Sequence, residues 1–231
     1  MMATGARDLR ITGLALAALA LWEASGWDLV VARWFGNGAG FGWRDHWLTS
    51  GLLHQGGRGL AWLMLAGLLA LTLKAWRRPA ARHEHLRWTA ATLAGLLLVP
   101  AIKRVSSTSC PWDLAEFGGL ADYVPHWQLG LTDGGAGHCF PSGHAVAAFA
   151  FFSLYFLWRR SHPARARGAL AAVLALGLLF GWAQLARGAH FPSHSLWSAW
   201  LCWALCVGAD RARIALGWRG RRVVPAAPRL R

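Results

Sequence analysis

The residues best suited to chemistry form a short stretch, Pro141-Ser142-Gly143-His144, just before a new apolar run. Proline and glycine permit a tight turn, and the first backbone amides of a following helix are unpaired donors that favour an anion. Ser142 offers a hydroxyl at a helix start, and His144 can transfer a proton near neutral pH. The pattern predicts a phosphate-binding turn, although an ordinary helix cap would use the same residue types.

Two further polar clusters lie beside other apolar runs. One covers residues 103–114 and begins with Lys103, and the other covers residues 184–194 and contains Arg187, His190 and His194. Cations, an anion-binding turn and two histidines are the groups that phosphoester cleavage through a phosphohistidine requires. One imidazole would attack phosphorus and the other would protonate the leaving oxygen.

Composition indicates what kind of protein must position these clusters. The 231 residues are 55% hydrophobic with a mean hydropathy of +0.32 and include 16 Trp, which favours a single membrane bundle. Lys and Arg number 24 against 10 Asp and Glu. These cations sit between apolar runs, which is typical of anchoring against anionic lipid headgroups and argues against a nucleic acid partner.

Six apolar stretches predict an all-α fold, an integral membrane six-helix bundle in residues 1–210, followed by a basic cytoplasmic tail in residues 211–231. The first stretch could also be a cleaved signal peptide. Residues 26–57 are expected to form a loop, and the polar segment 103–143 is long enough to be functional. The expected spans cover residues 9–26, 58–74, 88–103, 144–158, 168–187 and 194–210.

The distribution of Lys and Arg predicts the orientation of the bundle. With both termini in the cytoplasm, 18 of the 24 cationic residues lie on the cytoplasmic side and 6 on the other. Lys103, His144, Arg187 and His190 then share the outer, periplasmic face of a bacterial inner membrane. The predicted active site therefore faces the periplasm.

The three clusters together resemble the type 2 phosphatidic acid phosphatase family, whose pattern is Lys-x6-Arg-Pro, then Pro-Ser-Gly-His, then Ser-Arg-x5-His-x3-Asp. Lys103 keeps its spacing to Pro111, and the central motif is complete. The resemblance implies a hydrolase that needs no metal and no cofactor. It implies His190 as the nucleophile and His144 as the general acid. The residues it places around the phosphate are Lys103, Ser142 and Gly143.

Four residues depart from that pattern. Cys110 stands in place of the first-motif arginine, Ala183-Gln184 in place of Ser-Arg, and His194 in place of the aspartate. Arg187, three residues after Gln184, would lie one turn later on a continuing helix. We interpret it as the substitute phosphate clamp, the alternative being a headgroup anchor.

The replacement of the aspartate leaves the orientation of the nucleophile open. A neutral His194 could accept the ring proton of His190, supported by Gln184, but it supplies no negative charge. Asp113 or Glu116 are alternative partners. If none of these residues orients the nucleophile, the protein would be a slow or inactive relative of the family.

The cysteines and histidines allow two further interpretations. Cys110 and Cys139 both fall on the predicted outer face, where they could form a disulfide or remain separate thiols. The spacing of His190 and His194 is also compatible with a zinc site, but Pro192 between them interrupts a regular helix. Remaining residues are expected to have packing or structural roles: Cys202, Cys206, His46, His54 and His126.

The function expected from these patterns is hydrolysis of a lipid phosphate, with membrane lipids and the lipid phosphate as partners. By resemblance, candidates are a polyprenyl diphosphate, phosphatidic acid, a phosphatidylglycerol phosphate or a lipid A phosphate. Two alternatives remain: phosphoryl transfer to a second lipid, or lipid binding or translocation without chemistry. The identity of the lipid and the oligomeric state are left open.

Overall fold

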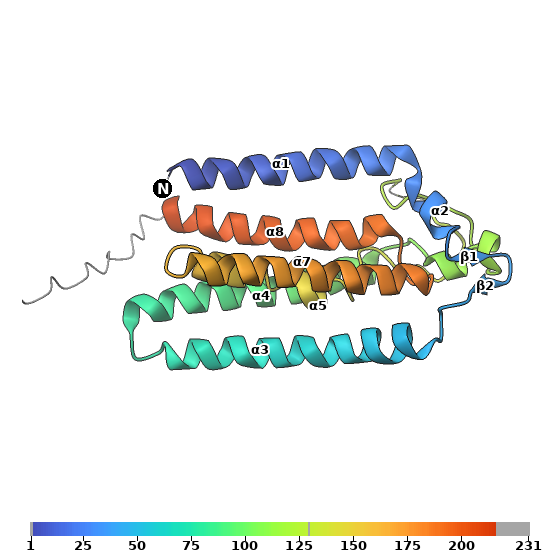
Figure 1. The fold of residues 1–231 in the computed structure, drawn as a ribbon. Coiled ribbons are helices and arrows are strands. Elements are labelled where there is room, and N and C mark those ends of the chain that lie inside the picture. Colours follow the sequence, from blue (N-terminus) through green and yellow to red (C-terminus); the bar gives the residue numbers. More distant parts are fainter. Residues whose placement is uncertain (1, 129, 216–231) are drawn as a thin grey trace, which may run out of the picture.

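The computed structural model describes residues 2–128 and 130–215, and helices dominate it. The long helices lie side by side in a bundle (Figure 1). They are α1 (Met2–Ser25), α3 (Gly57–Lys74), α4 (Pro79–Val105), α7 (Pro163–Ala186) and α8 (Pro192–Ala215). The shorter elements are α2 (Trp27–Ala32), β1 (Gly36–Asn37), β2 (Gly40–Phe41), the π-helix η1 (Trp47–Gly56), the 3-10 helices η2 (Pro111–Asp113) and η3 (Ala115–Phe117), α5 (Val146–Phe149) and α6 (Phe152–Trp158).

Among the residues that the structure describes, three helical segments are long and apolar enough to cross a membrane: Trp47–Lys74, Ala81–Val105 and Pro163–Ala186. A shorter apolar segment covers Val146–Trp158. Each of the predicted spans falls largely within helical structure. Helices α4, α7 and α8 each begin at a proline, which is favoured at the first helical position because no backbone N–H is needed there.

The structure corrects three expectations. Residues 26–57 are not simply a loop, because they contain α2, a short antiparallel hairpin and η1, which runs directly into α3. The predicted span 144–158 is divided into α5 and α6. Helix α8 also continues through Ala215, so the first residues of the predicted basic tail are helical, and residues 216–231 of that tail lie outside the described part of the chain.

Buried aromatic side chains fill the centre of the bundle. Trp88 of α4 and Phe156 of α6 are almost inaccessible and pack with ring centroids 5.2 Å apart. Hydroxyl pairs add polar links between helices: Thr72 with Thr89 at 2.8 Å and Thr92 with Ser153 at 2.6 Å. Buried hydroxyl groups need a hydrogen-bond partner. In each pair one hydroxyl donates to the other, so both have a partner.

Charged groups tie three helices together at the end of the bundle that holds the N-terminus (Figure 1). The guanidinium of Arg159, at the end of α6, contacts Asp8 of α1 at 2.6 Å and Asp210 of α8 at 2.7 Å. All three side chains are at least nine-tenths buried. The pairing is therefore a structural link between segments far apart in sequence.

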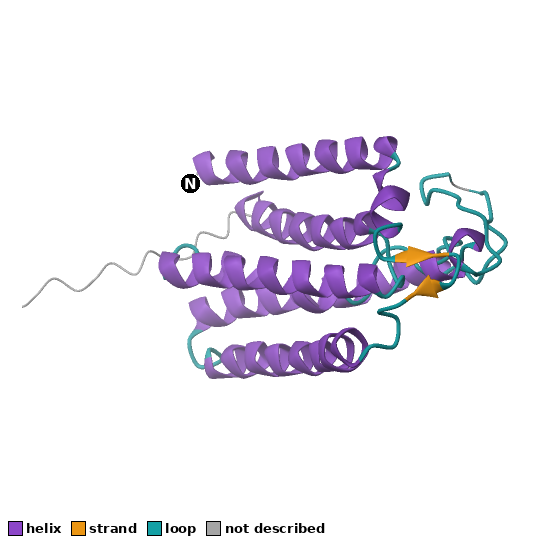
Figure 2. Ribbon diagram, turned by 45° about the vertical axis from the view of Figure 1, so that its right-hand side comes forward, coloured by secondary structure: helices purple, strands orange, loops and turns teal. Residues whose placement is uncertain are grey.

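A second, smaller core organises the opposite end, where α2 and the hairpin lie (Figure 2). Phe41 of β2 packs on Phe117 of η3, with ring centroids 4.8 Å apart, and Leu114 and Phe191 join the same cluster. Phe191 directly precedes α8. This cluster fixes the polar segment 103–143 against the start of α8, where the catalytic candidates lie.

Candidate active site

A cavity of about 350 Å³ opens at the end of the bundle that carries the hairpin. Its volume falls within the range of about 300–1,000 Å³ typical of small-molecule sites. Several of its lining side chains are cationic and none is a carboxylate, so it suits an anion. The lining residues are His54, Arg58, Lys103, Cys110, Trp112, Gly143, His144, Ala147, Gln184, Arg187, Ala189 and His190.

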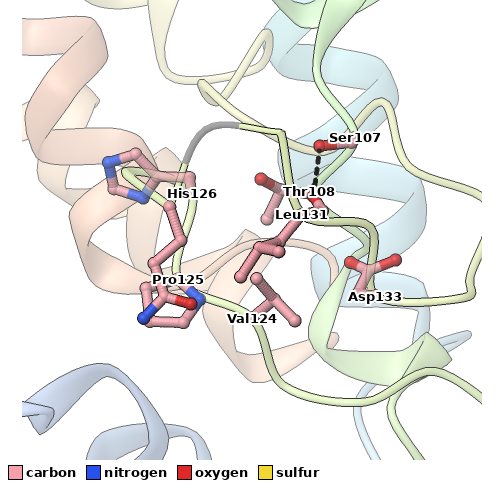
Figure 3. Close-up of a pocket in the computed structure, with 8 residues that line it drawn as sticks. Ser107, Thr108, Val124, Pro125, His126, Leu131 and Asp133 are labelled. Atoms are coloured by element: carbon pink, nitrogen blue, oxygen red, sulfur yellow. Dashed lines mark hydrogen bonds between the residues drawn. The ribbon is translucent and has the colours of Figure 1, made fainter.

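A second cavity, shown in Figure 3, is much smaller, with a volume of about 10 Å³. The Ser107 hydroxyl donates to the Leu131 carbonyl across it at 3.3 Å. A space of this size holds about one water molecule. The larger cavity is therefore the candidate substrate site.

The turn after α7 places His190 at this cavity. Helix α7 ends because Gly188 adopts a left-handed conformation, with φ of 72°. The backbone carbonyl of Gln184 then accepts hydrogen bonds from the amides of Ala189 (2.8 Å) and His190 (3.3 Å). A Cβ atom at Gly188 would overlap the ring of Phe41, so the position also requires glycine for space.

His190 faces His194 through one ring nitrogen. The two Nδ1 atoms are 3.4 Å apart, and both side chains are buried, with 4% and 1% exposed. At this distance one Nδ1 atom donates a hydrogen bond and the other accepts it, so the two rings share one proton. With Nδ1 engaged, the Nε2 atom of His190 is the nitrogen left for a substrate.

The charge state of His190 suits a nucleophile. Burial lowers the pKa of its imidazole well below 6.5, and the positive charge of Lys103 lowers it further. The ring is therefore neutral at physiological pH. A neutral imidazole keeps the lone pair that a nucleophile needs.

The start of α8 is held in place by a distant acid. Asp28 of α2 accepts hydrogen bonds from both the backbone amide (3.0 Å) and the hydroxyl of Ser193. Carboxylates are favourable at a helix N-terminus because the first amides lack partners there. This contact fixes the first turn of α8 and therefore His194.

His144 lies across the cavity from this turn, on the segment before α5. Its Nε2 atom is 3.1 Å from the carbonyl of Leu53, and its ring stacks on His54 with centroids 4.5 Å apart. The carbonyl can only accept, so His144 carries a proton on Nε2. Its Nδ1 atom is the remaining site for proton transfer.

Ser142 and Gly143 occupy different positions relative to the cavity. Gly143 lines it, whereas Ser142 is fully buried and its hydroxyl accepts from the Ala145 amide at 3.3 Å. The Ser142 amide donates to the His194 carbonyl at 3.0 Å. Ser142 therefore caps the following turn and links the Pro141-Ser142-Gly143-His144 stretch to the start of α8.

Three cations reach the cavity from three elements. Lys103 comes from the end of α4, Arg187 from the end of α7, and Arg58 from the start of α3. Arg187 donates its Nε–H to the Arg44 carbonyl at 2.8 Å, which leaves four donors on its two terminal nitrogens. Arg58 was not anticipated from the sequence.

The acidic residues considered as partners of His190 are engaged elsewhere. Asp113 accepts from the Cys110 amide at 3.2 Å, and Glu116 pairs with Arg33 on the surface. The geometry thus associates His190 with His194 rather than with either carboxylate.

Cys110 and Cys139 form a disulfide in the structure, with their Cα atoms 5.2 Å apart and a sequence separation of 29. This bears on the metal alternative, because Cys139, His190 and His194 place potential ligand atoms within 4.8 Å of one another. The metal ligand is a thiolate, and a disulfide sulfur is not one. That group therefore offers two imidazoles and lacks the third ligand of a typical zinc site.

His54 is the cavity residue that sequence reasoning assigned to a structural role. Its Nδ1 atom lies 3.3 Å from the side-chain nitrogen of Gln184, and its ring contacts His144. The available signal was its spacing: His54 and Arg58 are four residues apart at the start of an apolar run on the predicted outer face. Without η1, nothing in the sequence directed that pair toward His144.

Comparison with models of protein families finds a match. The family model described as the PAP2 superfamily matches residues 84–214, more than half of the chain. This range includes all three polar clusters. Comparison with curated proteins and with solved structures finds no significant match.

Proposed function

Because the chain belongs to the PAP2 superfamily, we propose that it is a membrane phosphatase that cleaves a lipid phosphomonoester or diphosphate through a phosphohistidine at His190. Membership supports phosphatase activity on phosphate esters. The observation that carries the finer proposal is the pairing of buried, neutral His190 with His194 at a cavity lined by cations.

The first step forms a P–N bond and breaks a P–O bond. Nε2 of His190 attacks phosphorus, and the electron pair of the broken bond stays with the lipid oxygen. In this proposal the negative charge of the bound phosphate favours protonation of His144 at both ring nitrogens. His144 is held by the Leu53 carbonyl and gives that oxygen the proton from Nδ1. The lipid leaves as an alcohol, or as a monophosphate when the substrate is a diphosphate.

The second step reverses these roles with water. His144 accepts a proton from water as its oxygen attacks phosphorus, the P–N bond breaks, and inorganic phosphate leaves. His190 returns to its neutral form. In both steps, Lys103 and Arg187 stabilise the negative charge on the phosphoryl oxygens.

The steps derived from these side chains need no metal ion. The proposal therefore includes metal independence, which predicts that phosphate release survives a chelator and is inhibited by orthovanadate. Loss of activity in the chelator with recovery on adding Zn²⁺ would instead favour the metal interpretation.

The membrane arrangement belongs to the same proposal. We place six spans in the inner membrane, both termini in the cytoplasm and the site at the periplasmic face. The Cys110–Cys139 disulfide supports this orientation, because such bonds persist in oxidising compartments and this one borders the cavity. A cysteine-accessibility experiment, with single cysteines placed in the 75–78 turn and the hairpin, tests it.

The test of function is a phosphate-release assay on the purified protein with a panel of lipid phosphates. His144→Ala, Arg187→Ala and His190→Ala are each expected to reduce release from the preferred substrate. Full activity in all three variants would contradict the site. Phosphate release without any acceptor lipid would separate hydrolysis from transfer.

A further inference from the structure

We propose that His54 binds the substrate phosphate and that Gln184 holds it in position, so that part of the phosphate clamp comes from η1 rather than from the end of α7. This inference rests on the proposed phosphatase function. It assigns a binding role to a residue outside the three polar clusters.

The local helix geometry brings two consecutive residues to the site. The Leu53 carbonyl accepts from His144 Nε2 at 3.1 Å, and the ring of His54 stacks on the ring of His144. Both belong to η1, a π-helical segment of the kind that recurs at functional sites. His54 also lines the main cavity.

The contact with Gln184 determines which nitrogen of His54 carries the proton. The side-chain amide nitrogen of Gln184 lies 3.3 Å from His54 Nδ1 and can only donate. Nδ1 therefore accepts, and the proton of a neutral His54 resides on Nε2. That N–H is a donor available to a phosphate oxygen.

Gln184 links this donor to the nucleophile. Its side chain holds His54, while its backbone carbonyl accepts from the amides of Ala189 and His190. Gln184 is 2% exposed, and burying an amide is costly unless it is hydrogen-bonded. One buried residue thus fixes His54 and His190 relative to each other.

Arg58 completes the arrangement. It follows His54 by four residues, and both line the cavity. His54 would supply a directed hydrogen bond and Arg58 a positive charge, two functions that one arginine can combine. Gln184 stands where the resemblance led us to expect an arginine, so His54 and Arg58 offer a replacement for it.

Two substitutions of His54 separate phosphate binding from ring stacking. His54→Phe keeps a ring against His144 but removes the donor, whereas His54→Gln keeps a donor and removes the ring. Binding of inorganic phosphate by calorimetry and the KM for a lipid phosphate are the measurements. We expect the Phe variant to weaken phosphate binding and to raise the KM, each by about 10- to 100-fold, as for the loss of a hydrogen bond to a charged group. The Gln variant should stay within about threefold of the unmodified protein in both quantities.

A double variant tests the replacement itself. In His54→Phe, adding Gln184→Arg places a longer, cationic donor beside the altered position and should recover phosphate binding. Gln55→Ala, an exposed residue of the same π-helix, is the matched control and should leave binding unchanged. Thermal unfolding of each variant verifies that it is folded.

The inference is overturned if His54→Phe binds phosphate as tightly as the unmodified protein, or if His54→Gln weakens binding as much as His54→Phe. Failure of the proposed function is distinguishable. It would appear as phosphate binding without phosphate release in the unmodified protein, and the His54 variants would still report on binding.

Discussion

The Nδ1 atoms of His190 and His194 lie 3.4 Å apart where both side chains are almost closed to solvent. In the proposed mechanism this pair orients the attacking imidazole, because a neutral His194 accepts the Nδ1 proton of His190. It cannot supply the negative charge with which a carboxylate stabilises the imidazolium. This relationship explains how the site can be assembled without the aspartate expected from the resemblance, and it implies a slower reaction.

Changing His194 should therefore affect activity in two directions. His194→Ala removes the acceptor and should lower kcat by about 10- to 100-fold, by analogy with the loss of a residue that orients a metal-bound histidine. His194→Asp restores an acceptor and adds charge, and should match or exceed the unmodified rate. Steady-state phosphate release measures both, and an Asp variant as slow as the Ala variant would contradict the orienting role.

Gly188 should tolerate no side chain. Gly188→Ala must adopt a left-handed backbone, at a cost of about 1–2 kcal/mol, and its Cβ would also overlap Phe41. Gly134 has a similar φ of 75° but open space around it, so Gly134→Ala is the control for strain alone. We expect Gly188→Ala to lose more unfolding free energy and more kcat than Gly134→Ala. Equal losses of both quantities in the two variants would contradict the packing argument.

The disulfide should contribute to stability through the unfolded chain. Closing a loop with a sequence separation of 29 residues is worth about 3.6 kcal/mol in the chain-entropy model. The double variant Cys110→Ser, Cys139→Ser should lower the unfolding temperature, and a reductant should lower that of the unmodified protein only. If the reductant shifts the double variant equally, the effect does not come from this bond.

Acid pH should reduce the stability that two histidines outside the spans contribute, the buried His190 and the half-buried His126. Burial lowers the pKa of His126 to about 4 and that of His190 well below 6.5. Between these lowered pKa values and 6.5, the unfolded chain binds more protons than the folded chain. Stability therefore declines as the pH falls below 6.5. Above pH 6.5 both histidines are neutral in both states and do not affect stability. Unfolding temperatures at pH 5–8 measure this, and His126→Phe should flatten the decline; an unchanged slope would contradict it.

Much of the site was predictable because its chemistry is local in sequence. Pro141 to His144 and the stretch from Gln184 to His194 each carry their functional groups within about one to three helical turns. Apolar runs bounded by cations likewise indicated helices that could cross a membrane. The matched range, residues 84–214, confirms the family that these patterns suggested.

What escaped prediction depends on contacts between distant segments. Asp28 holds Ser193 across 165 residues, and His54 meets Gln184 across 130. A glycine-rich stretch such as residues 26–57 predicts a loop, but its last part forms η1, which packs against α7 and continues into α3. Periodicity within one segment contains no information about such partners.

The most direct test of the account is to trap the intermediate. The purified protein is mixed with a radiolabelled lipid phosphate, quenched in alkali, which preserves phosphohistidine, and its peptides are analysed by mass spectrometry. We predict a phosphoryl group on His190, absent from His190→Ala, together with a loss of phosphate release of at least about 10³-fold in that variant. A phosphoryl group on another residue, or undiminished release in His190→Ala, would contradict the proposed mechanism.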